Sequence, residues 1–357
     1  MDSAISKTPV TVLTGYLGAG KTTLLNRILT ENHGKKYAVI VNEFGEIGID
    51  NDLIVDADEE VFEMNNGCIC CTVRGDLIRV LGGLMKRAGQ FDGILVETTG
   101  LADPAPVAQT FFVDEDIAAK TKLDAIVTVV DARHLSDEIG KAPEAEEQIA
   151  LADIIVLNKT DLVEEADLVA VEALVRRINP TVRVERAERS NVALDKILGL
   201  AAFDPDKILE EAPESLGDPV HDHDHPDHEC GDHCDHHHHH HDHDHDHDHD
   251  HGHGTHDPHV TSFALRSETP LNPEKFFPWI QMVCQEFGID LLRMKGILAF
   301  PDDDRRYVAQ AVHMMLEGDH NRPWRDDEAR VSRMVFIGRN LPRDIIEDGF
   351  EKCKATH

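Results

Sequence analysis

The sequence predicts an α/β protein whose N-terminal part forms a doubly wound, mostly parallel sheet. One observation is that short apolar runs rich in β-branched residues alternate with helical stretches between Pro9 and Phe203. Such continuously apolar strands indicate a parallel sheet that helices cover on both faces. The other is a glycine-rich loop between the first strand and the first helix, as in nucleotide-binding sheets of this class. The expected strands are residues 10–14, 37–42, 93–97, 125–131, 153–158 and 182–185.

The composition changes after Pro205, which predicts three regions: 1–203, 204–259 and 260–357. The middle region has too few apolar residues to offset the entropy of ordering, so we expect a disordered linker. Strands alternate with two helices in the last region, which predicts a small α+β domain. Its expected strands are 260–267, 296–300, 307–312 and 333–338; its expected helices are 272–287 and a last helix from 342; and its expected core includes Phe276, Phe277, Trp279 and Trp324.

The charge excludes one class of partner. The 357 residues carry a formal net charge of -33, whereas binding to nucleic acid requires a basic surface. No apolar stretch is long enough to span a membrane, and the N-terminus lacks the features of a secretory signal, so we expect a cytoplasmic protein with no membrane contact. In that compartment the seven cysteines are expected as metal or redox ligands rather than as disulfides.

A phosphate-binding loop is predicted between the first strand and the first helix. The segment from Gly15 to Thr22 matches G-x-x-x-x-G-K-[ST], in which backbone N–H groups surround phosphate at a helix N-terminus. Lys21 would neutralise phosphate oxygens, and the Thr22 hydroxyl would bind Mg2+. The residues expected to bind nucleotide here are Gly15, Gly18, Ala19, Gly20, Lys21, Thr22 and Thr23.

Two further strand ends complete the predicted nucleotide site. Glu97 ends the strand 93–97, three residues before Gly100, where a carboxylate could hold Mg2+ through a water molecule. Asn158, Lys159 and Asp161 form an N-K-x-D sequence after the strand 153–158. The Asp161 carboxylate can accept hydrogen bonds from N1–H and the exocyclic amine of guanine, a pair that adenine does not offer. We therefore expect GTP rather than ATP.

Three cysteines predict a transition-metal site. Cys68, Cys70 and Cys71 lie within four residues, and thiolates select zinc, copper(I) and other soft ions. Three local ligands leave a fourth position open, which suits transfer of a metal better than permanent storage.

Together, GYLGAGKTTLLN, VNEFGEIGID, NGCICC, ETTGLADP and NKTD resemble the CobW family of P-loop GTPases and metallochaperones, and RPW and MVFIGRNLP resemble its C-terminal domain. The resemblance implies slow GTP hydrolysis with Lys21, Thr22 and Glu97, and metal binding by Cys68, Cys70 and Cys71. It also implies a switch region in which Glu43 or Glu46 contacts Mg2+, γ-phosphate or the bound metal. Which of the two does so stays open, as does the residue that orients the attacking water.

The expected function is a GTP-hydrolysing metallochaperone that delivers zinc to a client protein. Alternatives are a cobalt or iron chaperone, as in cobalamin synthesis or nitrile hydratase activation, and a storage or sensing GTPase without delivery. A small-molecule kinase is disfavoured by the guanine-binding motif. The sequence leaves a homodimer open.

A histidine-rich tract, residues 221–259, adds a second metal-binding feature. It holds 19 of the 24 histidines and 12 acidic residues without Lys or Arg, so the rest of the chain carries -21 of the net charge. Neutral imidazoles bind Zn2+, Co2+ and Ni2+. Cys230, His233 and Cys234 are candidates for one tighter site, and a plain solvated spacer is the alternative. The isolated His134, His313 and His320 are expected at the surface or in packing.

Overall fold

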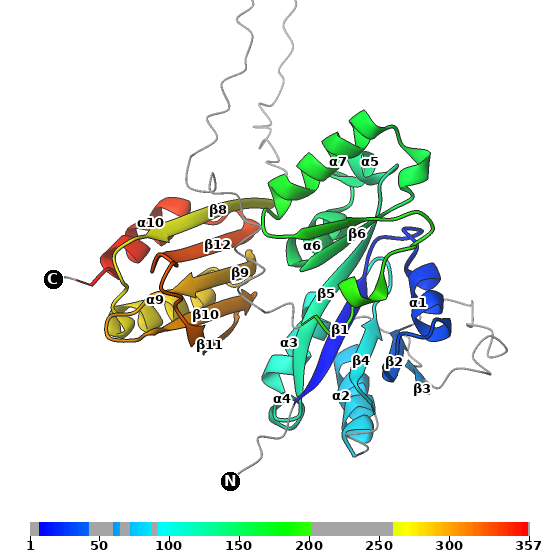
Figure 1. Ribbon diagram of the computed structural model, residues 1–357, viewed down its shortest axis with the longest axis horizontal. Helices are drawn as coiled ribbons and strands as arrows, with labels where there is room; N and C mark the ends of the chain where they lie inside the picture. Colours follow the sequence, from blue (N-terminus) through cyan, green and yellow to red (C-terminus); the bar gives the residue numbers. More distant parts are fainter. Residues whose placement is uncertain (1–6, 43–59, 65–71, 87–90, 201–259, 356–357) are drawn as a thin grey trace, which may run out of the picture.

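The computed structural model describes residues 7–42, 60–64, 72–86, 91–200 and 260–355, which form two sheets with their helices (Figure 1). The predicted linker lies outside these residues, so the boundaries of the three predicted regions stay predictions. No helix in the described ranges is both long and apolar enough to cross a bilayer.

The first sheet has seven strands in the order β3-β2-β4-β1-β5-β6-β7, and every pair is parallel. This confirms the predicted doubly wound class. The strands are β1 (Thr8–Thr14), β2 (Tyr37–Asn42), β3 (Glu60–Met64), β4 (Gly93–Glu97), β5 (Thr121–Asp131), β6 (Ile154–Asn158) and β7 (Arg183–Arg186). The elements between them are α1 (Lys21–Thr30), α2 (Thr72–Met85), α3 (Ala105–Val113), α4 (Glu115–Ala118), α5 (Leu135–Glu138), α6 (Pro143–Leu151), η2 (Thr160–Leu162), α7 (Glu165–Ile178) and, after β7, η3 (Leu194–Lys196).

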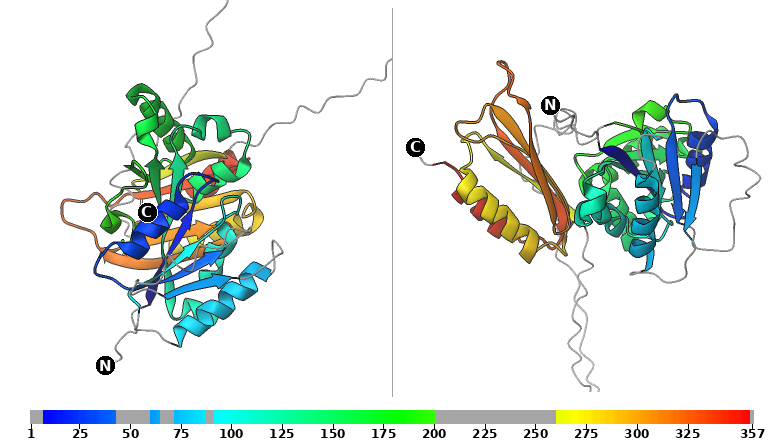
Figure 2. Two further views of the ribbon diagram at one scale, coloured as in Figure 1. Left: turned by 90° about the vertical axis from the view of Figure 1, so that its right-hand side faces the viewer. Right: turned by 90° about the horizontal axis from the view of Figure 1, so that it is seen from below.

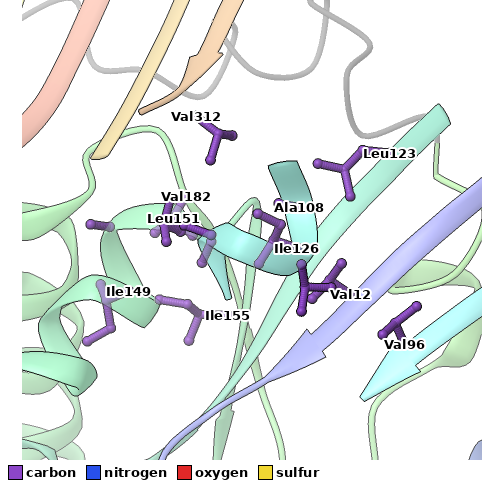
Figure 3. Close-up of a cluster of buried hydrophobic side chains, with 14 of the residues drawn as sticks. Val12, Val96, Ala108, Leu123, Ile126, Ile149, Leu151, Ile155, Val182 and Val312 are labelled. Atoms are coloured by element: carbon purple, nitrogen blue, oxygen red, sulfur yellow. The ribbon is translucent and has the colours of Figure 1, made fainter. Parts of the chain in front are cut away.

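Helices cover both faces of this sheet, as the continuously apolar strands require. On one face, α1 packs Leu24, Leu25 and Ile28 against strand residues such as Val39 and Val127. On the other face, apolar side chains of α2, α3, α6 and α7 surround Val12, Val96 and other strand residues. Figure 3 shows part of that second cluster.

The second sheet has five strands in the order β11-β10-β9-β12-β8, all antiparallel. Its strands are β8 (Val260–Ser267), β9 (Leu291–Leu298), β10 (Arg305–Val312), β11 (Met315–Pro323) and β12 (Ser332–Arg339), and its helices are α9 (Pro273–Glu286) and α10 (Arg343–Lys352). Phe276 and Trp279 are buried in its core as predicted, whereas Phe277 is 39% exposed and Trp324 is only partly buried.

Three strands differ from the prediction. The strand expected at 296–300 is β9, which runs from Leu291 to Leu298, and the sequence analysis missed β11. Arg293 and Lys295 interrupt the apolar pattern of β9, although both are buried. Most of β11 is polar and exposed because it is an edge strand. The seventh strand of the first sheet, β3, was also missed.

The five-stranded sheet lies between its own helices and the first domain. Figure 2 shows α9 and α10 on its outer face, while its inner face is turned toward the helices of the parallel sheet. Elements α3, α6 and α7 contact this inner face. Val260, Leu292, Val312, Val335 and Ile337 belong to the same buried cluster as the first domain's α2, α3, α6 and α7. The two sheets therefore share a hydrophobic core.

Candidate nucleotide site

The carboxyl ends of four adjacent strands meet at one edge of the parallel sheet. The pairing places Leu13 of β1 beside Glu97 of β4, and Asp131 of β5 beside Asn158 of β6. Ligands bind at this edge in open α/β sheets. The fold thus brings the phosphate loop, Glu97 and the N-K-x-D segment to one edge, although up to 146 sequence positions, from Gly15 to Asp161, separate them.

The phosphate loop depends on glycine at three positions. Gly15, Gly18 and Gly20 have φ angles of 141°, 74° and 115°, a region that side chains with a Cβ atom rarely adopt. At Gly20 a Cβ atom would also collide with the side-chain amide of Asn158 and lie 2.9 Å from Ser190 Oγ. The loop can therefore approach these residues only with glycine at this position.

The loop ends at the N-terminus of α1, where an anion would be favoured. In the described part of the chain, no side chain caps this helix, so its first N–H groups can serve a ligand. Thr22 and Thr23 are exposed in this first turn. The arrangement fits a bound phosphate with a metal ion beside Thr22.

Lys21 is buried and its ammonium lies over the loop. Nζ donates to the carbonyl oxygen of Gly15 at 2.6 Å and to that of Tyr16 at 3.2 Å. Burial lowers the pKa of Lys21, while the neighbouring Glu97 carboxylate opposes that effect. A phosphate would supply stronger acceptors than the two carbonyls, so Lys21 is positioned to exchange them for phosphate oxygens.

Glu97 is nearly buried, at 9% exposure, and the next residue holds it against β1. The Thr98 backbone N–H donates to Leu13 O at 2.9 Å, and Thr98 Oγ1 donates to Thr14 Oγ1 at 2.8 Å. These bonds fix the end of β4 beside the phosphate loop. A carboxylate here can take part in holding Mg2+, a hard cation that prefers oxygen ligands.

Asn158 connects the phosphate loop to the segment after β7. Its Nδ2 donates to Ala19 O at 2.8 Å, and its Oδ1 accepts from the Ser190 backbone N–H at 2.7 Å. Ser190 Oγ in turn donates to Gly20 O at 3.0 Å. Asn158 therefore ties the N-K-x-D loop to the phosphate loop and to Ser190.

Lys159 and Asp161 take different positions in the same loop. Lys159 has a left-handed backbone, with a φ of 62°, and its Nζ donates to Asp131 Oδ2 at 2.7 Å. The methylene chain can then lie along the face of a base. Asp161 is exposed in η2, so its carboxylate is accessible to a ligand.

The sequence analysis missed Asp131, which lies at the end of β5. Its Oδ2 accepts from Lys159 and from His134 Nδ1, the latter at 2.8 Å. Burial alone would raise the pKa of Asp131, but hydrogen bonds from Lys159, His134 and the Arg133 backbone outweigh it and lower the pKa. A carboxylate that ends an apolar strand, as Glu97 does, was a signal that could have found it. Ser190 lies in no motif, so no sequence signal pointed to it.

The other predicted site residues lie outside the described residues: Glu43, Glu46, Cys68, Cys70, Cys71, Cys230, His233 and Cys234. Within the described ranges, no three His, Cys, Asp or Glu side chains are grouped to hold a metal ion. Cys284 and Cys353 are buried, and burial raises the pKa of each thiol to about 11. They are thus poorly suited to bind metal as thiolates near neutral pH.

Known protein families match both domains of the chain. Residues 9–186 match the CobW/HypB/UreG nucleotide-binding domain, and residues 260–354 match the C-terminal domain of the cobalamin synthesis protein CobW. The chain is 33% identical over 345 residues to the zinc chaperone YjiA of Escherichia coli (strain K12), covering 96% of this chain and 97% of that protein.

A eukaryotic relative and a solved structure agree with this. The zinc-regulated GTPase metalloprotein activator 1 of Schizosaccharomyces pombe (strain 972) is 33% identical over 363 residues, covering 96% of this chain and 85% of the relative. The crystal structure of Zn(II)-bound YjiA GTPase from E. coli is 28% identical, with a TM-score of 0.70, and covers 98% of this chain and 100% of that one. With its phosphate loop, N-K-x-D loop and second sheet, this chain belongs to the CobW/HypB/UreG family of P-loop GTPases.

Proposed function

We propose that this protein is a GTP-hydrolysing metallochaperone that binds zinc and delivers it to a metal-dependent client in the cytoplasm. The observation that carries the GTPase part is the Asn158 side chain, which joins the N-K-x-D loop to the phosphate loop at Ala19. This hydrogen bond would hold base recognition and phosphate binding in one site. The zinc part rests on the relatives, which are named zinc chaperones and a zinc-regulated activator.

The phosphate end of the site would use Lys21 and the first turn of α1. Lys21 would move from the carbonyls of Gly15 and Tyr16 to phosphate oxygens. The backbone of Gly18, Ala19 and Gly20 would follow the phosphate chain, and Thr22 with Glu97 would hold Mg2+. When bound, Mg2+ would neutralise phosphate charge that builds up during hydrolysis.

The base end of the site would select guanine. Asp161 is exposed and acceptor-only when ionised, so it pairs with the N1–H and exocyclic amine of guanine. Adenine presents an unprotonated N1 at that position, which would leave the carboxylate facing a lone pair. Replacement of Asp161 by Ala is therefore expected to reduce the preference for GTP over ATP.

The cargo site would be formed by Cys68, Cys70 and Cys71, with Glu43 or Glu46 linking it to the nucleotide. If the cysteine loop and the switch segment share one nucleotide-dependent arrangement, GTP raises zinc affinity, and zinc raises GTP affinity by the same factor. Hydrolysis would then loosen the site and release zinc to the client. Cobalt or iron as the cargo is the alternative, since three thiolates accept these metals as well.

Zinc titration against a chromophoric chelator tests this proposal. The protein is best used with residues 221–259 deleted, so that the tract does not mask the cysteine site. We expect tighter zinc binding with GTP and Mg2+ than with GDP and Mg2+, and loss of the site when all three cysteines are changed to Ser. Equal zinc affinities in both nucleotide states would contradict the coupled carrier. Lys21→Ala is the matched variant that should remove the nucleotide effect and keep the basal zinc affinity.

We further propose that the tract between the domains, residues 221–259, collects metal, with Cys230, His233 and Cys234 as its tightest site. Deleting it should lower the number of bound zinc ions per chain and leave GTP hydrolysis intact. An unchanged stoichiometry would favour a spacer. Release of zinc to an acceptor chelator on adding GTP, but not with a non-hydrolysable analogue, would separate a carrier from a storage protein.

A further inference from the structure

Three consecutive residues of helix α6 contact two different parts of the protein: the turn after Glu97, beside the phosphate loop, and the five-stranded sheet. Glu146, Glu147 and Gln148 point in directions about 100° apart around the helix. Two of them bind the five-stranded sheet, and the third binds the turn that follows Glu97. None of the three belongs to a motif that the proposed function uses.

Gln148 clamps the turn after Glu97. Its Nε2 donates to the carbonyl oxygens of Gly100 at 3.1 Å and Ala102 at 3.2 Å. The turn is closed by a bond from the Ala102 N–H to Thr99 O at 3.0 Å. Gln148 is 1% exposed, so both bonds are shielded from water. The turn can therefore rotate only if these two bonds break or are exchanged for others.

The clamped turn lies directly against the phosphate loop. A Cβ atom at Gly100 would be 2.7 Å from Leu17 Cδ2 and 2.8 Å from the Leu17 backbone nitrogen. The turn and the loop therefore move together or collide. If a γ-phosphate displaces Gly100, the displacement acts directly on Gln148, because Gln148 donates to the Gly100 carbonyl.

The same helix holds the second sheet. Glu147 Oε1 accepts from Arg339 of β12 at 2.5 Å. Glu146, which is buried, accepts from the Val260 backbone N–H at 3.2 Å and from the Gly140 N–H at 3.0 Å. Any shift of α6 therefore acts on the first residue of β8 and the last residue of β12.

Gln148 also has an unused acceptor that could stabilise a second conformation of the turn. Its Oε1 is buried and has no hydrogen-bond partner among the described residues. A buried acceptor without a partner is unfavourable, so a rotation of the turn that brings a peptide N–H to Oε1 is energetically supported. A side-chain amide with two donated bonds and one unused acceptor can hold the turn in two ways.

We propose that Gln148 is a positioning residue that couples the nucleotide state of the Thr99–Ala102 turn to the five-stranded sheet through α6. The proposal rests on the proposed GTPase function. In this proposal the five-stranded sheet changes its position when GTP binds. A client protein that contacts the sheet could then distinguish the GTP-bound state from the GDP-bound state. Gln148 is not among the residues proposed to bind nucleotide or metal.

A double-mutant cycle on nucleotide preference tests the coupling. The ratio of the dissociation constants for GDP and GTP, with Mg2+, is measured for the wild type, Gln148→Met, Arg339→Gln and the double variant. Because typical couplings begin at about fivefold, we expect Arg339→Gln to change the ratio at least about fivefold alone and less than about twofold beside Gln148→Met. Gln285→Met, an exposed glutamine in α9, is the matched control and should leave the effect of Arg339→Gln intact.

The outcomes separate the two proposals. Equal effects of Arg339→Gln in both backgrounds, or none in either, would overturn the coupling while leaving the GTPase intact. A wild-type protein that binds ATP as well as GTP would overturn the proposed function and the coupling with it. If Gln148→Met does not fold, the cycle is repeated with Gln148→Asn in place of Gln148→Met and Glu147→Gln in place of Arg339→Gln. The same fold-changes in the ratio of dissociation constants are then expected.

Discussion

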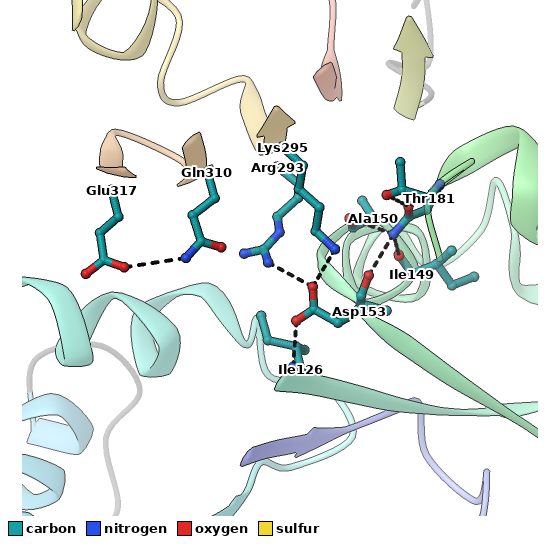
Figure 4. A network of polar contacts seen from close by, with 11 residues as sticks. Ile126, Ile149, Ala150, Asp153, Thr181, Arg293, Lys295, Gln310 and Glu317 are labelled. Atoms are coloured by element: carbon teal, nitrogen blue, oxygen red, sulfur yellow. Dashed lines mark hydrogen bonds and ion pairs between the residues drawn. The ribbon is translucent and has the colours of Figure 1, made fainter. Parts of the chain in front are cut away.

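Replacing Asp153 by Asn is expected to destabilise the contact between the two sheets strongly. Asp153 precedes β6 and is buried against β9, where its Oδ1 lies 2.8 Å from Arg293 NH2 and 2.6 Å from Lys295 Nζ. Its Oδ2 accepts from the Ile126 backbone N–H at 2.9 Å. Figure 4 shows both basic side chains of β9 directed at this carboxylate. The Asn variant keeps the shape and removes the charge.

The size of the effect follows from these contacts. Two charge-assisted hydrogen bonds at about 1.5–3 kcal/mol each give roughly 3–6 kcal/mol. Removing one partner of a buried ion pair costs about 3–5 kcal/mol. Because Asn can still accept from Ile126, we expect the lower part of the shared range, about 3–4 kcal/mol. Adding Lys295→Met removes one cation left without its partner and should recover about half of the loss.

Urea unfolding followed by tryptophan fluorescence measures this loss. Both tryptophans of the chain lie in the second domain, Trp279 in α9 and Trp324 after β11, so the signal reports that sheet. Asp167→Asn, an exposed carboxylate in α7, is the control and should change the unfolding free energy by less than about 0.5 kcal/mol. A loss below about 1 kcal/mol for Asp153→Asn would refute the ion-pair reasoning.

The pH dependence gives a second check on the same carboxylate. Burial alone would raise the pKa of Asp153, but Arg293 and Lys295 outweigh it and lower the pKa. A lowered carboxyl pKa contributes stability above its unfolded value of about 3.9, and that contribution is lost as the pH falls through the folded value. The difference between wild type and Asp153→Asn should thus be constant from about pH 5 to 8 and shrink below about pH 4.

Three further substitutions have defined outcomes. Gly20→Ala should weaken GTP binding at least about tenfold in calorimetric titration, because the new Cβ meets Asn158 and Ser190; Gly34→Ala, also at positive φ but in open space, should leave binding unchanged. Asn179→Ala removes donors to three carbonyls near the end of α6 and should lower the unfolding free energy by about 2–4 kcal/mol in a urea melt; a neutral variant would show that those carbonyls find other donors. Asp131→Asn removes the charge that holds Lys159 and should weaken GTP binding about tenfold with little change in melting temperature. A clear drop in melting temperature together with the weaker binding would indicate a folding defect instead.

Much of the parallel sheet could be predicted because its strands are buried on both faces. The expected strands 37–42 and 93–97 coincide with β2 and β4, and the others differ at their ends by a few residues. The second sheet was harder to predict because its strands do not all show their burial. In β9, Arg293 and Lys295 look like solvent-facing residues, yet both form buried ion pairs with Asp153, which lies 140 positions before Arg293.

The residues of the candidate nucleotide site likewise fall into two groups, those that the sequence pointed to and those that only the structure revealed. Lys21, Glu97 and Asn158 could be named as candidates from the sequence because each stands at a fixed offset from a strand end. Asp131 and Ser190 were missed because their roles depend on partners from distant loops, Lys159 and Gly20. Such pairs follow from the order of strands in the sheet, which local patterns do not encode.

The sequence by itself determined the fold class, the phosphate-loop motif, the N-K-x-D motif and the family, because each depends on residues within short segments. Only the tertiary structure decided that Asp153 joins the two sheets, that Asp131 holds Lys159, and that Gln148 links the turn after Glu97 to α6. The physical reason is that a charge or an amide can be buried only where another element supplies its partner. That partner is known only once the chain has folded.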